Sequence, residues 1–263
     1  MGITVRRPDF DLSELPRWWV GGSRLGTWFG NAGHVFIPIG ERFFIDAVKA
    51  FRGRTEDDEL AGEIRAFIGQ ESVHSRVHEA VWDQLRGHGA PVDAYAHLVE
   101  QLRERLSPLV PAELQLATTA ALEHYTAAYG RAFLTEDIAA VLGDEMAALL
   151  RWHGAEEIEH RSVAFDVLTE VDDALVLRLA GLVLGSALLT VVPVLGVAMF
   201  AAEDIRRGRV RIPRAPSPEL LAMTACFTVT VGREVARFVV PGFRPGDDPL
   251  PAAYLAWAED AAA

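Results

Sequence analysis

The sequence predicts an all-α protein whose helices form a bundle, and three observations support this. Apolar residues recur at helical spacing in several successive windows of the 263-residue chain. No window shows the alternation of apolar and polar residues, bounded by turns, that is typical of strands. Half of the residues are apolar, which is enough to fill a sizeable core.

The first bundle helix is expected to start near Pro38 and Gly40 and to end at Gly53. Residues 1–34 before it, rich in tryptophan and glycine, are expected to be an irregular lead-in. The apolar positions of the helix follow helical spacing; they are Phe43, Phe44, Ile45, Val48 and Phe51.

The other bundle helices are separated by proline and glycine. They are expected over residues 55–86, 92–106, 111–133 and 143–170. Thr55 is a good N-cap, because its hydroxyl accepts hydrogen bonds from free amides. Pro111 suits the first position of a helix, where no amide donor is needed. The metal-binding bundle is thus expected to occupy residues 35–172.

Residues 173–263 are expected to form an apolar helical extension packed on the bundle or on a membrane. Residues 179–202 carry no charge and are long enough to cross a bilayer, whereas residues 220–232 are too short. A basic linker joins the two stretches; it contains Arg206, Arg207, Arg209, Arg211 and Arg214. For a true span, the positive-inside rule would place the bundle outside the cell. A hairpin in one leaflet and a core helix or dimer interface therefore remain as alternatives.

Composition excludes several classes of protein. A net charge of −12 argues against nucleic-acid binding, which depends on a basic surface. The single cysteine, Cys226, excludes an internal disulfide and a thiolate cluster, so a metal would be held by nitrogen and oxygen. The first twelve residues do not resemble a secretory signal. We therefore expect a cytoplasmic protein, associated with the inner face of the membrane if it contacts one.

Two short motifs place carboxylates and imidazoles on common helix faces. The candidate ligands are Glu71, His74 and His78 on one helix and His153, Glu157 and His160 on another. Because successive residues turn by about 100° around a helix, each set lies on one stripe about 60° wide or slightly more.

Two further acidic residues complete the pattern. Glu41 and Glu123 lie in apolar helices, where an unpaired carboxylate would be costly to bury. The order Glu, Glu-x-x-His, Glu, Glu-x-x-His is typical of two-metal sites in ferritin-like four-helix bundles. Bridging carboxylates hold two cations close together, and imidazoles complete the coordination. The sequence therefore predicts two metal ions, with iron expected and manganese or zinc as alternatives.

Four segments carry a resemblance to a known family. They are residues 40–44, 67–74, 121–126 and 152–160, with the run Pro241-Gly242-Phe243-Arg244-Pro245 near the end. Over roughly residues 35–245 the chain resembles a bacterial family described as predicted metal-dependent hydrolases. The resemblance implies metal binding at the positions named above.

The alternative to a metal site is a network of buried salt bridges with Arg42, Arg65 and Arg161. His78 and His153 are interpreted either as third nitrogen ligands or as donors to the ligands. The remaining polar residues of interest are expected to lie away from the metals. His124 is assigned to the core or to a supporting role, Glu156 and Glu159 to solvent or to arginine partners, and His34, His88 and His97 to loops or the surface.

Three functions are compatible with this pattern. The leading hypothesis is an oxygen-dependent di-iron oxidase, hydroxylase or desaturase of a hydrophobic, lipid-like small molecule, with dioxygen and an electron donor as partners. Its catalytic carboxylates would be Glu41, Glu71, Glu123 and Glu157. The alternative is a hydrolase that uses metal-activated water. The third is a non-catalytic metal-binding or membrane-associated protein that forms homo-oligomers.

Overall fold

Helices are the regular secondary structure of the described part of the chain. The structure is a computed structural model, and it describes residues 2–209 and 217–260. No strand is present among these residues, so the all-α prediction is confirmed. Arg211 and Arg214 of the expected basic linker lie outside the described residues.

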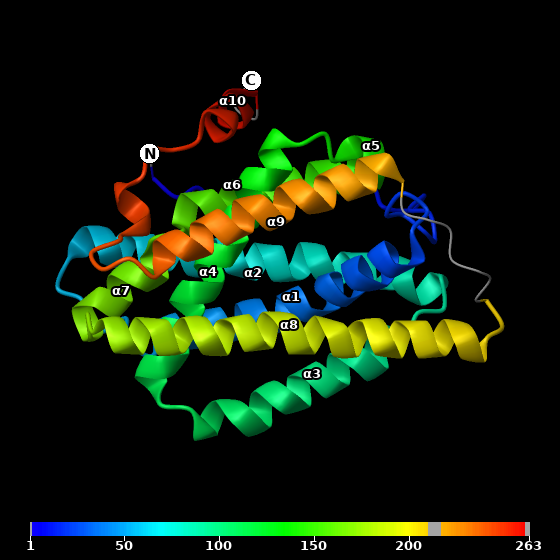
Figure 1. The fold of residues 1–263 in the computed structure, drawn as a ribbon. Helices are drawn as coiled ribbons and strands as arrows, with labels where there is room; N and C mark the ends of the chain where they lie inside the picture. Colours follow the sequence, from blue (N-terminus) through cyan, green and yellow to red (C-terminus); the bar gives the residue numbers. More distant parts are fainter. Residues whose placement is uncertain (1, 210–216, 261–263) are drawn as a thin grey trace.

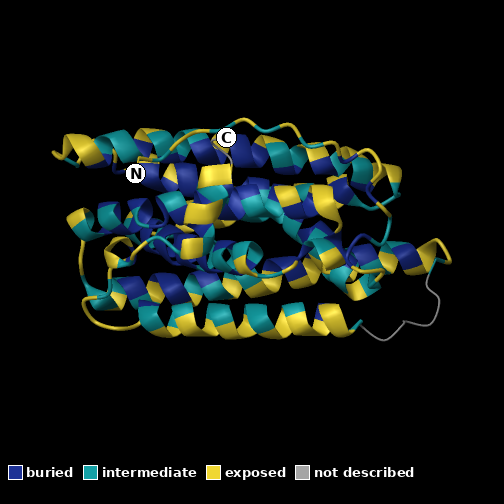
Figure 2. Ribbon diagram, turned by 90° about the horizontal axis from the view of Figure 1, so that it is seen from above, coloured by how far each residue is buried: buried dark blue, intermediate teal, exposed yellow. Residues whose placement is uncertain are grey.

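Four helices form the core of the bundle. They are α1 (Arg24–Lys49), α2 (Asp58–Gly87), α4 (Ala112–Thr135) and α6 (Asp144–His160). Helix α1 packs along α2, and α4 packs along α6. Figure 2 shows that buried residues concentrate in the inner helices, whereas the outer helices turn exposed faces to solvent.

The remaining helices surround this core. They are α3 (Val92–Leu106), α5 (Ala139–Leu142), α7 (Val163–Val171), α8 (Leu175–Arg206), α9 (Pro218–Phe238) and α10 (Ala252–Asp260), with short 3-10 turns at Ser107–Leu109 and Pro245–Asp247. Helix α8 packs on α4 and α1, and α9 packs on α4. Figure 1 shows α8 on the near side, between α9 and α3, with no other helix in front of it.

Helix α1 begins fourteen residues before the expected Pro38, so the prediction of an irregular lead-in is wrong for residues 24–34. The side chain of Ser23 caps the helix by accepting a hydrogen bond from the Gly26 amide. Pro38 lies inside the helix and has no amide to donate to the carbonyl of His34. The indole of Trp82 donates to that carbonyl instead, at 2.9 Å. A contact from α2 thus allows α1 to continue through the proline.

The expected helix over residues 143–170 is divided into α6 and α7 at Arg161 and Ser162. The Arg161 guanidinium donates to the carbonyl of Ile158 at 2.6 Å, which takes an acceptor that a continuous helix would use. It also donates to the carbonyls of Pro245 and Asp248. The C-terminal segment is therefore fixed at this break. The expected helices over 55–86, 92–106 and 111–133 agree with α2, α3 and α4 within three residues.

Helix α8 is the described helix that is long and apolar enough to cross a membrane. Only 28% of its most apolar 18-residue window is buried against the rest of the protein. Length and composition alone do not distinguish a span from other uses of such a helix. Membrane contact and a cytoplasmic location stay predictions.

Helices α4 and α6 approach most closely at a pair of glycines. A Cβ atom added to Gly130 would lie 2.2 Å from the carbonyl oxygen of Gly154, and one added to Gly154 would lie 2.6 Å from the Cα of Gly130. Real Cβ contacts are never this short, so both positions require glycine. The contact lies two turns from Glu123 on α4 and one turn from Glu157 on α6. It therefore sets how closely these carboxylates approach.

We predict that Gly130→Ala destabilises the protein by about 1–3 kcal/mol, because the added methyl must push α4 and α6 apart. Thermal unfolding followed by circular dichroism measures this. Gly33→Ala is the matched control: a Cβ there meets no atom within 4 Å, and alanine favours a helix over glycine. Equal melting temperatures for the two variants would contradict the close approach.

Candidate metal centre

The eight predicted ligands converge in the middle of the bundle. Helix α1 supplies one of them, α2 three, α4 one and α6 three. All are buried, with exposed fractions of 7% or less. In chain order they are Glu41, Glu71, His74, His78, Glu123, His153, Glu157 and His160. Their binding of a metal ion stays a prediction, but the fold brings all of them to one place.

The first group able to hold a cation consists of two Glu-x-x-His pairs, one from α2 and one from α6. Its members are Glu71, His74, Glu157 and His160, and each offers an atom within 4.8 Å of the others. Nε2 of His160 lies 3.1 Å from Oε1 of Glu71. Nδ1 of His74 lies 3.4 Å from an oxygen of Glu71 and 3.4 Å from one of Glu157. The geometry suits one cation among two carboxylates and two imidazoles.

The second group is richer in nitrogen and contains Glu41, His78 and His153. Nε2 of His78 lies 2.7 Å from Nδ1 of His153. Nε2 of His153 lies 2.8 Å from Oε1 of Glu157, which belongs to the first group. Glu157 therefore borders both groups and is placed to bridge two cations.

The unsatisfied polar atoms of the interior gather at these groups. Among the described residues, seven of the ten buried side-chain nitrogen and oxygen atoms without a hydrogen bond belong to six predicted ligands. They are Oε1 of Glu41, both oxygens of Glu71, Nδ1 of His74, Oε1 of Glu123, Oε2 of Glu157 and Nε2 of His160. Burying a polar atom without a partner costs about 1–3 kcal/mol. Cations would satisfy these atoms, so the residues present fit the predicted metals.

A carboxylate outside both groups holds the ring of His74. Nε2 of His74 lies 3.0 Å from Oε2 of Glu156, which leaves Nδ1 directed at the first group. The other oxygen of Glu156 accepts from the indole of Trp152 at 3.1 Å and from Arg6 at 3.1 Å. Such a carboxylate fixes the tautomer and orientation of a metal-binding histidine.

The prediction that Glu156 is exposed or simply paired with arginine is therefore incomplete, because its side chain is fully buried. Glu159, in contrast, pairs with Arg6 at 2.7 Å, as expected. The second half of α6 is covered on nearly all sides, because residues 152–158 are all buried. The apolar neighbours Trp152, Ala155 and Ile158 are the sequence signal for this burial.

Glu123 holds His160 in the same way. Nδ1 of His160 lies 2.8 Å from Oε2 of Glu123, and Nε2 is directed at Glu71. In this arrangement Glu123 orients a ligand and is outside both groups. Its second oxygen is buried without a hydrogen bond, so its predicted role as a ligand stays open.

His34 is a residue of the site that sequence reasoning assigned to a loop. It is buried on α1, and its Nδ1 lies 2.8 Å from Nδ1 of His78. The contact leaves Nε2 of His78 directed at His153. His34 precedes Glu41 by seven residues, which places both on one helix face. This spacing could not be used in the sequence analysis, because His34 was expected to lie before the helix and not within it.

Electrostatics distinguishes the two groups. Burial by itself would lower the pKa of His74, but its hydrogen bonds to carboxylates raise the pKa well above the usual value. The pKa of His160 is raised in the same way by Glu123 and Glu157. Burial lowers the pKa of His78 far below the usual value, and neighbouring imidazoles lower it further. In the first group, protons therefore compete with a cation for the imidazole nitrogens. In the second group the imidazoles are neutral, so their nitrogens are free of this competition.

The N-terminal strap, residues 2–12, closes the side of the site between α2 and α6. The amide of Gln70 donates to the carbonyl of Thr4 at 2.9 Å, and Val5 packs on Gly69. Arg6 pairs with Glu156 and with Glu159. The strap therefore covers the carboxylate that orients His74.

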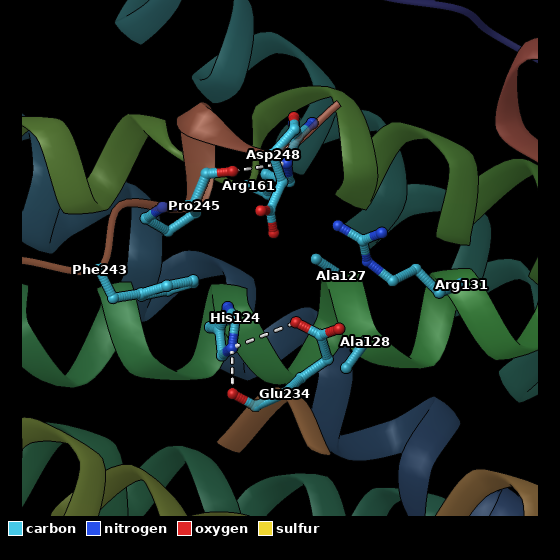
Figure 3. Close-up of a pocket in the computed structure, with 9 residues that line it drawn as sticks. All are labelled: His124, Ala127, Ala128, Arg131, Arg161, Glu234, Phe243, Pro245 and Asp248. Carbon is cyan, nitrogen blue, oxygen red and sulfur yellow. Dashed lines mark hydrogen bonds and ion pairs between the residues drawn. The ribbon is translucent and has the colours of Figure 1, made fainter. Parts of the chain in front are cut away.

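His124 lies about 100° around α4 from Glu123 and faces α9. Its ring contacts the carbonyl of Glu234 at 2.8 Å, and the pKa of His124 is lowered by burial. Figure 3 shows the small cavity beside it, between Arg131, Arg161 and Asp248. Its volume of about 10 Å³ holds about one water molecule. His124 therefore has a structural role, as expected, and this cavity is too small for a substrate.

Comparison with known proteins gives one match. The model of a family described as predicted metal-dependent hydrolases matches residues 4–248, which confirms the resemblance found in the sequence. No curated protein and no solved structure matches the chain.

We predict that Glu156→Gln weakens metal binding about 10–100-fold, because the amide no longer holds His74 in its orientation. His160→Ala removes a ligand and should lose at least one ion per chain. Metal analysis after dialysis at graded chelator concentrations measures both effects. Glu145→Gln, an exposed change on the same helix, should leave metal content unchanged. Full retention of metal by His160→Ala would show that the constellation is wrong.

We predict that Arg6→Ala speeds the extraction of metal by a chelator about tenfold, because loss of two ion pairs lets the strap open more often. Arg7→Ala is the control, since no ion pair involves this exposed neighbour in the described structure. Stopped-flow mixing with a coloured chelator gives the two rates. If both variants release metal at the rate of the unchanged protein, the strap does not control access.

Proposed function

Because the chain belongs to the family of predicted metal-dependent hydrolases, we propose that it is a hydrolase that uses two metal ions. The observation that carries the metal dependence is the cluster of buried, unsatisfied carboxylate and imidazole atoms described above. The hydrolytic direction rests on the family match. Hydrolysis, the alternative in the sequence analysis, thus becomes the main proposal, and oxidation becomes the second candidate.

The two groups divide the ligands between the ions. In this proposal Glu71, His74, Glu157 and His160 hold one ion, and Glu41, His78 and His153 hold the other. When bound, the cations would lower the pKa of a water molecule and polarise the carbonyl or phosphoryl group of a substrate. The chain contributes fixed geometry: Glu156 orients His74, and Glu123 orients His160.

The same residues exclude bulk water. The predicted ligands are almost fully buried, and charges act more strongly on one another in such an interior than in water. Substrate must therefore enter by displacing part of the protein. The strap is the segment best suited to move, since polar contacts of Thr4 and Arg6 hold it.

A groove beside the strap supports the expectation of a hydrophobic small-molecule substrate. It lies between residues 7–12 and α2, and its volume is about 290 Å³, near the lower end of the range for ligand pockets. Its apolar lining is Pro8, Phe10, Leu12, Val73, Val77 and Ala80. The polar lining is Arg7, Asp9 and Arg76. Its two arginines outnumber its one carboxylate, so a compound with an apolar body and an anionic end would fit.

Oxidation of a small molecule remains a second candidate, favoured by one observation. Carboxylate and histidine ligands from four helices, with a Glu-x-x-His pair on each of two, are the pattern of di-iron carboxylate centres. In that case dioxygen and an electron donor would be the partners.

We predict that protein stripped of metal and reloaded with two equivalents of Zn²⁺, Mn²⁺ or Fe²⁺ hydrolyses at least one of three chromogenic probes. The probes are p-nitrophenyl butyrate, butyryl p-nitroanilide and bis-p-nitrophenyl phosphate, which represent ester, amide and phosphodiester bonds. Glu157→Gln should lower the rate by at least about 100-fold, since this residue borders both ions.

The control for this assay is Glu145→Gln, which should keep the full rate. The hydrolase proposal fails if no reloaded form cleaves any probe. Consumption of dioxygen by the reduced Fe²⁺ form, without hydrolysis, would support the oxidative candidate instead.

A further inference from the structure

One face of α8 lies outside the bundle and carries only apolar and small side chains. Ten exposed residues lie along this face: Val176, Ala180, Val183, Ala187, Thr190, Val191, Val194, Ala198, Ala202 and Ile205. Leu195, which is 40% exposed, lies at its edge beside Val194. Three quarters of Val176 and 71% of Val183 are exposed. We call these ten residues the α8 stripe. The exposure of all ten means that no described helix covers the stripe. Figure 1 shows α8 at the front of the bundle with no helix before it.

Helix α8 cannot rotate to bury the stripe, because glycines on its opposite face pack closely against α4 and α1. A Cβ at Gly181 would lie 2.4 Å from the backbone of Ala117 on α4. One at Gly196 would lie 2.6 Å from Ala32 on α1 and equally close to Tyr95. Helix α8 is therefore locked in its rotation, and the stripe faces away from the protein.

The spacing of the stripe is nearly the same when it is read in either direction. Its midpoint lies between Thr190 and Val191, and the intervals on both sides are three and four residues, as in helices that pack along their length. Reversal about the midpoint places Val183 opposite Ala198 and Ala187 opposite Val194. A large side chain thus meets a small one, which is the condition for close packing.

The two ends of the stripe carry opposite charges. Asp172 and Asp173 are exposed just before α8 begins. Arg206 and Arg207 are exposed at the other end. Both pair with the same carboxylate, that of Glu203, so this pair of arginines keeps an excess of positive charge. In an antiparallel pair of α8 helices, the acidic end of each would meet the basic end of the other. The pair would therefore be complementary in charge as well as in shape.

We propose that the α8 stripe binds the α8 stripe of a second copy of this chain, antiparallel and about a twofold axis near Thr190. A twofold interface requires a surface that complements itself, and the reversed spacing and opposite ends provide this. A bilayer is the less suitable occupant, because the stripe has no aromatic residue at either end and carries acid at one. Its many alanines instead favour close approach of helices.

Site-specific cross-linking tests the direction of the pair. In full-length protein with Cys226→Ser, which removes the native thiol, Thr190→Cys should cross-link to itself with a short bismaleimide. Val176→Cys should not, because its two copies would lie about 44 Å apart along the helix pair. A mixture of Val176→Cys and Ile205→Cys protein should cross-link. Self-linking of Val176→Cys would overturn the antiparallel arrangement.

Charge reversal provides the matched test. Asp173→Arg alone and Arg206→Asp alone should each weaken the dimer about tenfold, and the double variant should restore it, as measured by analytical ultracentrifugation. Val183→Glu with Val194→Glu should give a monomer with unchanged circular dichroism and metal content. A monomeric unchanged protein would overturn the proposal. Binding to a membrane would also overturn it. In that case the protein without cross-linker would sediment with phosphatidylcholine–phosphatidylglycerol vesicles, and the variant with Val183→Glu and Val194→Glu would not.

Discussion

The structure depends on one electrostatic constraint: buried carboxylates must share a small volume with buried imidazoles. Glu41, Glu71 and Glu157 cannot all be ionised there unless positive charge compensates them. Protons on His74 and His160 supply part of this positive charge, since the pKa of each ring is raised. Metal cations would supply it in place of these protons. The interior is therefore arranged for an ion.

Much of the surrounding fold serves this arrangement. The Gly130 and Gly154 contact brings α4 and α6 together so that Glu123 reaches His160. On the other side, α2 and α6 are bridged by the strap, whose Arg6 compensates the charge of Glu156. Glu156 in turn fixes His74. The rings of His74 and His160 thus each have one nitrogen facing the centre and one held by a carboxylate. Helical spacing alone does not provide this geometry.

The sequence predicted the parts of the site that depend on spacing within one helix. The i, i+3 and i, i+4 relations among Glu71, His74 and His78 are set by helical geometry, so they could be read directly. The parts that depend on contacts between distant segments could not. At Pro38 the indole of Trp82 replaces the missing amide donor by donating to the carbonyl of His34. Helix α1 therefore continues through the proline, and His34 lies at the site. Glu156 was likewise missed, since its burial depends on residues about 150 positions earlier in the chain.

The chemistry and the proposed dimer meet at α4. Its inner face carries Glu123 towards the metal centre, and its outer face receives Gly181 of α8 against Ala117, six residues earlier. Because these contacts are between backbones, a shift of α8 cannot be absorbed by side-chain rotation and would move α4. A partner helix that clamps α8 from outside would therefore hold α4 in place. In the proposed dimer, the apolar face of α8 would thus serve to hold the ligand-bearing helices in place.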